Sequence, residues 1–141
     1  MSPSRTLLAV ATAALLAACA SGGPAKDPAA AQTALDRAVV RWQALIDGRA
    51  NDAWDLLTPG VRSTVTRERY AQEWASKPVR YVTVAPVDEL CDPDACTVTV
   101  EVEYQVRIPL TGMGNTRVGA VLDERWVKID GVWYHLPDDY R

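Results

Sequence analysis

The sequence predicts an α+β domain in which N-terminal helices, the first of them long, pack on a curved antiparallel sheet of about four strands. Two features lead to this prediction. Apolar residues recur with a helical period of about 3.6 before Pro78 and alternate with a period of about 2 after it. The 141 residues, 48% hydrophobic and 23% charged, are enough for one globular core and too few for two.

The longest predicted helix covers residues 31–47. It ends before Gly48, a natural stop because glycine readily adopts the left-handed conformation found just after many helices. Its apolar residues recur at spacings of four, three and four: Leu35, Val39, Trp42 and Ile46. The other face is predicted to be polar, with Asp36, Arg37, Arg41, Gln43 and Asp47.

Two shorter helices are predicted after it. Asn51 is expected to cap the first of them, and Pro59-Gly60 to end it. Thr66 is expected to cap the second, which stops before Lys77-Pro78 because the residue before a proline disfavours the helical conformation.

Four strands are predicted beyond this point, over residues 79–87, 97–108, 116–129 and 132–136. The second alternates cleanly, and its apolar face consists of Val98, Val100, Val102, Tyr104, Val106 and Ile108. A Gly-rich turn is expected at residues 111–115. Asp130-Gly131 is the strongest hairpin signal, and a two-residue turn there pairs Trp126 with His135.

The N-terminus indicates export. Leu7 to Ala18 is almost wholly apolar, but its twelve residues make a helix of only about 18 Å, which is typical of a signal peptide rather than a membrane span. Leu16-Ala17-Ala18-Cys19 then resembles the lipobox of bacterial lipoproteins. The resemblance implies cleavage before Cys19, lipidation of its thiol and acylation, for example with palmitate, of the new amine. The alternative is an ordinary secretory peptide with a cysteine there by chance.

The chain is therefore expected to comprise a signal peptide (1–18), a lipidated cysteine with a flexible tether (19–30) and an α+β domain (31–141). In lipoproteins of Gram-negative bacteria, an aspartate after the cysteine retains the protein at the inner membrane. Ala20 stands in that place, so the resemblance implies a lipid-anchored protein at the periplasmic face of the outer membrane.

Net charge limits the partners of the domain. Loss of Arg5 with the signal peptide leaves fourteen basic and eighteen acidic residues, which changes the net charge from −3 to −4. Nucleic acid is not expected as a partner, because phosphate binding needs clustered positive charge. An acidic domain is also poorly suited to lie on anionic lipid, so we expect contact with the membrane through the anchor at Cys19.

Cys91 and Cys96 flank a short segment between the first two predicted strands, and Cys19 is taken by lipid. In an oxidising compartment a disulfide between Cys91 and Cys96 is favoured, with free or metal-binding thiols as the alternative. Acidic residues crowd the same segment: Asp88, Glu89, Asp92 and Asp94. Without calcium-loop spacing they are expected to form a solvated loop, and no metal or cofactor is predicted.

His135 is the only histidine, and thus the only side chain suited to proton transfer near neutral pH. Glu124 lies two residues from its predicted partner Trp126, on the same face of the sheet. An acid–base pair of Glu124 and His135 is therefore a weak catalytic candidate. A packing role for the histidine is the favoured alternative.

Three segments resemble the nuclear-transport-factor-two-like superfamily, also called cystatin-like or SnoaL-like: residues 44–48 (ALIDG), 53–59 (AWDLLTP) and 124–134 (ERWVKIDGVWY). The resemblance implies a cone-shaped fold with a pocket between helix and sheet, often dimeric through the sheet. The superfamily includes isomerases, dehydratases, hydrolases and non-catalytic binding domains, so the resemblance implies a shape and leaves activity open.

Aromatic residues are candidates for a pocket or an interface, or simply for the core: Trp42, Tyr104, Trp126 and Trp133. The favoured hypothesis is a non-catalytic envelope lipoprotein that binds a protein partner, a second copy or a small apolar ligand. Trp42 and Tyr104 would then line the pocket, and Trp126 and Trp133 would face a partner. One alternative is a small isomerase or hydrolase using His135. Another is an immunity protein whose acidic loop blocks a cell-wall-degrading toxin.

Overall fold

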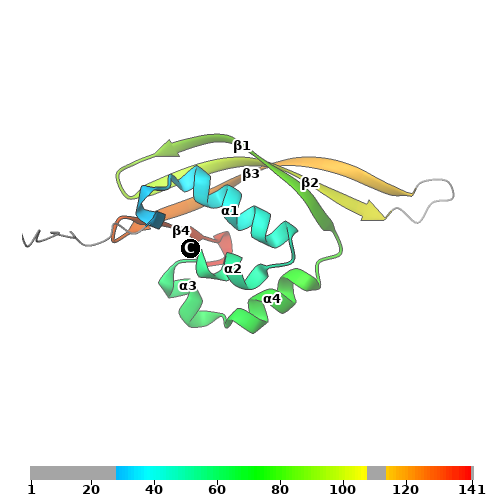
Figure 1. Cartoon of the computed structure of the whole chain (residues 1–141), viewed down its shortest axis with the longest axis horizontal. Coiled ribbons are helices and arrows are strands. Elements are labelled where there is room, and N and C mark those ends of the chain that lie inside the picture. The colour runs from blue at the N-terminus through cyan, green and yellow to red at the C-terminus, as the bar shows by residue number, and fades with distance from the viewer. Residues whose placement is uncertain (1–27, 108–113, 141) are drawn as a thin grey trace, which may run out of the picture.

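The computed structural model describes residues 28–107 and 114–140; the predicted signal peptide, Cys19, residues 20–27 of the tether and residues 111–113 of the Gly-rich turn lie outside this range. Helices precede strands, and one curved sheet covers the helices (Figure 1), so the predicted α+β class is confirmed. In the described residues no helix is long and apolar enough to span a membrane. The elements are η1 (Pro28–Ala31), α1 (Ala34–Ile46), α2 (Ala50–Asp55), α3 (Pro59–Thr64), α4 (Arg67–Ala75), β1 (Arg80–Cys91), β2 (Ala95–Arg107), β3 (Asn115–Ile129), β4 (Val132–Leu136) and η2 (Asp138–Tyr140).

Helix α1 begins at a complete capping box. The Thr33 hydroxyl accepts a hydrogen bond from the backbone N–H of Asp36 (3.1 Å), whose carboxylate accepts one from the N–H of Thr33 (3.0 Å). The carboxylate of Glu89 in β1 accepts a further bond from the N–H of Leu35 (2.8 Å). These caps explain why the helix starts at Ala34 and not at residue 31 as predicted.

Replacing Thr33 by alanine is expected to lower the free energy of unfolding by about 1 kcal/mol, because the N–H of Asp36 then loses its acceptor. Urea denaturation measures the change. Thr33→Ser keeps the hydroxyl and should cost much less; equal losses in the two variants would contradict a capping role.

The segment between α1 and α4 contains two helices where one was predicted. Helix α2 starts after Arg49, which makes no side-chain capping bond, so Asn51 is not the cap. Pro59-Gly60 begins α3 and does not end the preceding helix: Thr58 provides the cap, and the proline takes the first helical position, where an N–H is not needed. Thr66 caps α4 as predicted.

The strands form one antiparallel meander in the order β1-β2-β3-β4. Asp130 and Gly131 both have positive φ, 51° and 82°, and the turn pairs Trp126 with His135 as predicted. Strand β1 runs beyond its predicted end at residue 87 to Cys91. A register shift after Pro86 carries it past the proline, which an edge strand tolerates. The predicted acidic loop is therefore reduced to residues 92–94.

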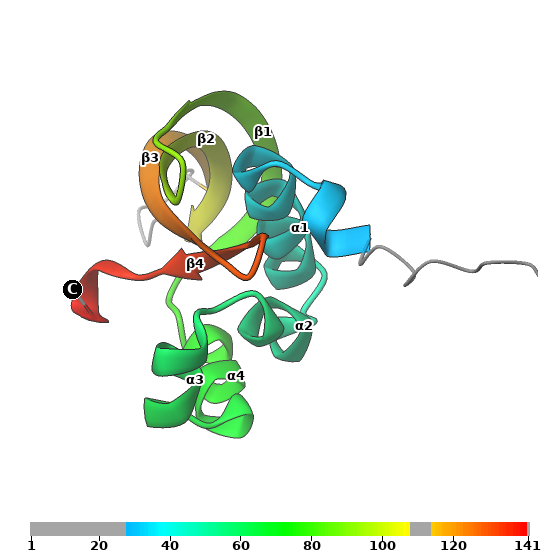
Figure 2. The same cartoon turned by 90° about the vertical axis from the view of Figure 1, so that its left-hand side faces the viewer.

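The sheet curls around α1, while α3 and α4 lie farther from it (Figure 2). The predicted apolar face of β2 is confirmed for Val98, Val100 and Val102, which are fully buried against Ala38 and Trp42 of α1. A second apolar cluster joins the helices to one another and consists of Ala44, Ala50, Ala53, Leu57, Val61, Val65 and Tyr70.

Candidate functional site

Two arginines of α1 are buried, although the sequence pattern assigned both to the polar face. Arg37 and Arg41 are only 6% and 4% exposed. They share a face with Ala34, Ala38 and Trp42, because residues three or four apart lie side by side along a helix. Arg37 donates from Nε to a backbone carbonyl of β4. The prediction that Arg37 and Arg41 lie on the face opposite the core is therefore wrong.

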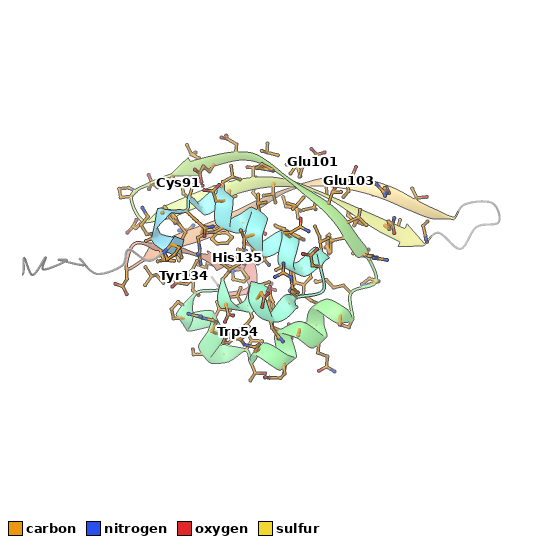
Figure 3. The ribbon with its side chains drawn as sticks, in the orientation of Figure 1. Trp54, Cys91, Glu101, Glu103, Tyr134 and His135 are labelled. Carbon is orange, nitrogen blue, oxygen red and sulfur yellow. A yellow bond between two sulfur atoms is a disulfide. The ribbon has the colours of Figure 1, made fainter. Side chains whose placement is uncertain are left out.

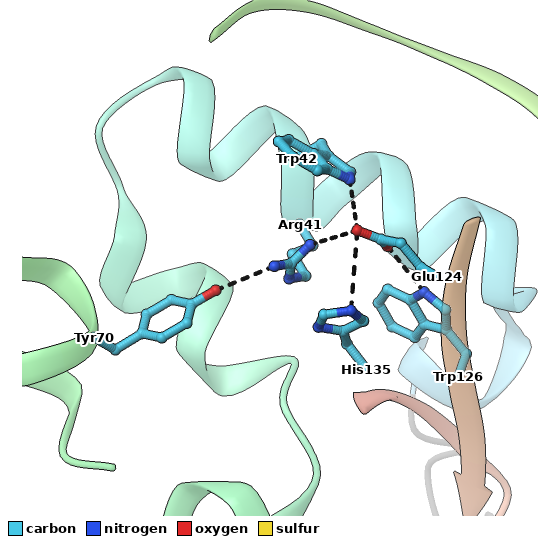
Figure 4. A network of polar contacts seen from close by, with 6 residues as sticks. All are labelled: Arg41, Trp42, Tyr70, Glu124, Trp126 and His135. Carbon is cyan, nitrogen blue, oxygen red and sulfur yellow. Dashed lines mark hydrogen bonds and ion pairs between the residues drawn. The ribbon is translucent and has the colours of Figure 1, made fainter. Parts of the chain in front are cut away.

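Glu124 of β3 gathers three donors in the interior (Figure 4). Its Oε1 accepts from Arg41 Nη1 and from Trp42 Nε1, both at 2.8 Å, and its Oε2 accepts from Trp126 Nε1 at 3.1 Å. Arg41 Nη2 also donates to the Tyr70 hydroxyl at 3.4 Å. Since Glu124 is only 8% exposed, protein donors replace the water that its carboxylate would otherwise bind.

The Arg41–Glu124 contact is a buried ion pair. Burial alone lowers the pKa of Arg41, but the charges and hydrogen bonds of Glu124 and Tyr70 outweigh it and raise the pKa above its ordinary value. The guanidinium is thus charged, although its Nε has no hydrogen-bond partner among the described residues. Desolvation offsets much of the attraction in such a pair, so its main effect is to fix α1 against β3.

The candidate catalytic pair, Glu124 and His135, makes no hydrogen bond. His135 Nε2 lies 3.9 Å from Glu124 Oε1, too far for a hydrogen bond, and the imidazole packs 5.4 Å from the Trp126 ring, centroid to centroid. Burial, with the charge of Arg41, lowers the pKa of His135 well below its ordinary value. Of the cavities described below, none is lined by His135 or Glu124. The structure therefore places both residues in a closed interior.

Acid is expected to destabilise the fold through His135. Its pKa is lower in the folded chain than in the unfolded chain, where it is about 6.5, so the unfolded state binds the proton first. Stability from the neutral imidazole is complete above about pH 7. It falls by up to about 1.4 kcal/mol per pH unit from pH 6.5 down to the folded-state pKa. Urea midpoints of wild type and His135→Gln, measured from about pH 7.5 to 5, should show this extra slope in the wild type alone; parallel slopes would contradict it.

Cys91 and Cys96 form the disulfide that was favoured over free or metal-binding thiols, with Cα atoms 4.1 Å apart across the β1–β2 hairpin (Figure 3). A cavity of about 280 Å³ lies beside it. The Glu89 carboxylate and the two sulfur atoms lie within 4.8 Å of one another. In the disulfide each sulfur is bonded to the other, and the carboxylate already accepts the N–H of Leu35, so we assign no metal to this group.

A groove of about 670 Å³ opens where the end of α1 meets α4 and the start of β1. Most of its lining is apolar or aromatic: Leu45, Ile46, Ala50, Ala71, Trp74, Ala75, Pro78, Val79 and Tyr81. Lys77 and Arg80 add positive charge, and no acidic residue occurs in the described lining, although the protein as a whole is acidic. The volume lies within the usual range of small-molecule sites, about 300–1,000 Å³.

The predicted pocket residues Trp42 and Tyr104 lie behind this groove. Tyr81, which lines it, packs on both of them, with ring centroids 5.0 Å and 6.0 Å away, and Trp74 lies 5.8 Å from Trp42. Burial, with Tyr104 nearby, raises the pKa of Tyr81 above its ordinary value, so its hydroxyl is neutral. Trp42 and Tyr104 therefore support the groove from beneath.

Trp126 and Trp133 do not face a partner. They are 0% and 6% exposed, and the Lys128 ammonium lies 4.5 Å from the centroid of the Trp133 ring. The outer face of the sheet is instead polar around Glu101 and Glu103, which point away from the helices (Figure 3). The prediction that the two indoles contact a second subunit is therefore wrong, because the curl of the sheet encloses them.

Two solved structures share this arrangement at low sequence identity. A SEC-C motif containing protein from Rhodopseudomonas palustris superposes with a TM-score of 0.58 at 12% identity, over 75% of this chain and 79% of that one. A candidate NTF2-like transpeptidase from Campylobacter jejuni gives a TM-score of 0.55 at 13% identity, over 76% of this chain and 100% of that one. No protein-family model and no curated protein matches the sequence. The comparisons show the fold alone, and the NTF2-like α+β architecture implied by the sequence resemblance is confirmed.

No site role was predicted for Arg41 or for the groove residues Trp74 and Tyr81. A signal for Arg41 was present: Glu124 lies on the inward face of β3 beside Trp126, and a buried carboxylate requires a cation or donors. No comparable signal marked Trp74 and Tyr81, because the groove exists only where residues from separate helices and strands meet.

Proposed function

We propose that this chain is a lipid-anchored envelope protein whose domain binds a small apolar ligand in the groove between α1, α4 and β1. The observation that carries the proposal is the groove itself, a depression of about 670 Å³ with Trp74 and Tyr81 in its wall. Its size is that of small-molecule sites, and its aromatic side chains offer an apolar ligand a surface to pack on, while polar groups make up about half of the exposed wall.

The aromatic floor supports this proposal. The ring centroids of Trp74 and Tyr81 lie 5.8 Å apart and both rings pack on Trp42, so the floor is already formed without a ligand. A preformed site loses less side-chain freedom on binding than a flexible one. Lys77 and Arg80 favour a ligand whose polar end is neutral or negative.

Non-catalytic binding is favoured over catalysis because the acid–base candidates are enclosed. His135 and Glu124 are 6% and 8% exposed, and a base must come within hydrogen-bonding reach of the proton it removes. The anchor is proposed from the motif Leu16-Ala17-Ala18-Cys19, which lies nine residues or more before η1. Nine residues reach at most about 30 Å when extended, which leaves the domain close to the membrane surface.

Ala75→Trp tests the groove. Ala75 is exposed at the end of α4 and lines the groove, so an indole there should fill it without entering the core. The fluorescence of the apolar probe N-phenyl-1-naphthylamine should rise and saturate with the wild type, and the affinity should fall at least about tenfold in the variant.

Ala85→Trp is the matched control, because Ala85 is also exposed but lies on β1 outside the groove. It should bind the probe like the wild type. Wild-type affinity in Ala75→Trp, or equal losses in the two variants, would contradict binding in the groove.

A further inference from the structure

A third and smaller cavity, here called the inner cavity, lies between α1, α3, α4 and the residues that follow β4. Its volume is about 180 Å³, and at about 30 Å³ per water it has room for roughly six water molecules or one small organic molecule. Apolar side chains form much of its wall: Leu57, Val61, Val65, Trp74 and Pro137. Two buried polar side chains, Arg41 and Tyr70, also line it.

Arg41 has hydrogen-bonding capacity to spare in this cavity. A guanidinium carries five N–H donors. Nη1 donates to Glu124 at 2.8 Å, Nη2 makes only a long bond of 3.4 Å to Tyr70, and Nε has no partner among the described residues. Nε is fully enclosed and does not face the cavity, so an acceptor in the cavity would be bound by Nη2, whose present bond to Tyr70 is long.

The groups at the buried end of the cavity favour a hydrogen-bond acceptor, while the charges of the whole lining balance, with Arg41 and Lys77 against Glu73 and Asp139. Arg41 and the Tyr70 hydroxyl are the polar groups that line it there. Lys77 adds a second cation at the exposed mouth, where its Nζ lies 4.6 Å from the Trp74 ring. The acidic lining residues, Glu73 and Asp139, are exposed, and Glu73 is paired with Arg69 at 3.1 Å.

We propose that this cavity binds the carboxylate of a small organic acid, with Arg41 and Tyr70 donating to it and Lys77 balancing its charge. Nη2 of Arg41 can donate to a carboxylate in the cavity while Nη1 remains bonded to Glu124, which holds the guanidinium in place. The inner cavity differs from the proposed ligand groove because Arg41 and Tyr70 line it, although the two share Trp74 and Lys77.

Binding can be followed through the indole N–H signal of Trp42 by NMR, because this group donates to the same carboxylate oxygen as Arg41. The full chain in detergent is titrated with sodium benzoate and, separately, with benzyl alcohol as its neutral analogue. Benzoate should shift the signal to saturation, and benzyl alcohol should not. Tyr70→Phe removes only one hydroxyl and should weaken benzoate binding about two- to tenfold. Arg41 itself is left intact because Glu124 depends on it.

Two control variants test whether binding is local to the inner cavity. Lys128→Gln removes an exposed ammonium that lies over Trp133 as Lys77 lies over Trp74, and it should leave benzoate affinity unchanged. Ala75→Trp, which fills the groove, should also leave it unchanged. The proposal is overturned if benzoate gives no saturable shift, if benzyl alcohol acts equally, if Tyr70→Phe binds like the wild type, or if either control variant weakens binding as much as Tyr70→Phe does.

Discussion

Replacing Glu124 by alanine is expected to lower the free energy of unfolding by about 3–5 kcal/mol, because the variant leaves the buried Arg41 charge without its partner. The indole N–H groups of Trp42 and Trp126 lose their acceptor in the same change. Few substitutions combine an unpaired charge with two unsatisfied donors. Urea denaturation at pH 7.5 measures the loss.

Two comparisons isolate the cause. Glu101→Ala removes an exposed glutamate from the outer face of the same sheet and should stay within about 0.5 kcal/mol of the wild type. The double variant Arg41→Met/Glu124→Leu removes both charges and should recover much of the lost stability, since a buried pair replaced by apolar residues costs little. A loss below about 1 kcal/mol in Glu124→Ala would contradict a buried ion pair.

Trp126→Ala is expected to cost a similar amount, about 3–5 kcal/mol, for a different reason. Trp126 is the largest of the fully buried side chains in the described residues. Its removal leaves a cavity between β3, β4 and α1. The imidazole of His135, which rests on the indole, would lose its packing surface.

Val121→Ala is the matched control for this prediction, since Val121 lies on the same strand but is 65% exposed. It should change the free energy of unfolding by no more than about 0.5 kcal/mol. Trp126→Phe keeps most of the apolar surface and should fall between the two. If Trp126→Ala unfolds at the urea concentration of the wild type, the indole is not part of the core.

The elements that local chemistry controls were predictable. An Asp-Gly pair readily adopts the positive φ that a two-residue hairpin turn requires, and both residues have it here. The turn at Asp130-Gly131 therefore determines the pairing of Trp126 with His135. The alternation of β2 likewise identified its buried face, because adjacent strand residues point to opposite sides.

The predicted ends of helices and strands were wrong where one residue is compatible with two local structures. Pro59 stops a preceding helix but also suits the first position of a new one, and Thr58 before it was the cap that favoured the second meaning. Strand β1 was predicted to end at residue 87, before the acidic residues Asp88 and Glu89, yet it continues past a register shift that an edge strand accommodates.

The candidate site could be predicted only in part, because it depends on contacts distant in sequence. Arg41 and Glu124 lie 83 residues apart, so neither residue identifies the other through spacing. The same distance explains why Glu124 was matched with His135, a neighbour across the hairpin, when its carboxylate in fact pairs with α1. The groove required the docking of α4 against the start of β1, which no periodicity encodes.

The most direct measurement of the proposed role is the mass of the N-terminal peptide of the protein taken from its native membrane. We expect a chain that begins at Cys19, lacks residues 1–18 and carries a diacylglyceryl group on the cysteine sulfur. An N-terminus that retains Met1 or residues close to it, with an unmodified Cys19, would contradict the anchor and with it the envelope location of the binding domain.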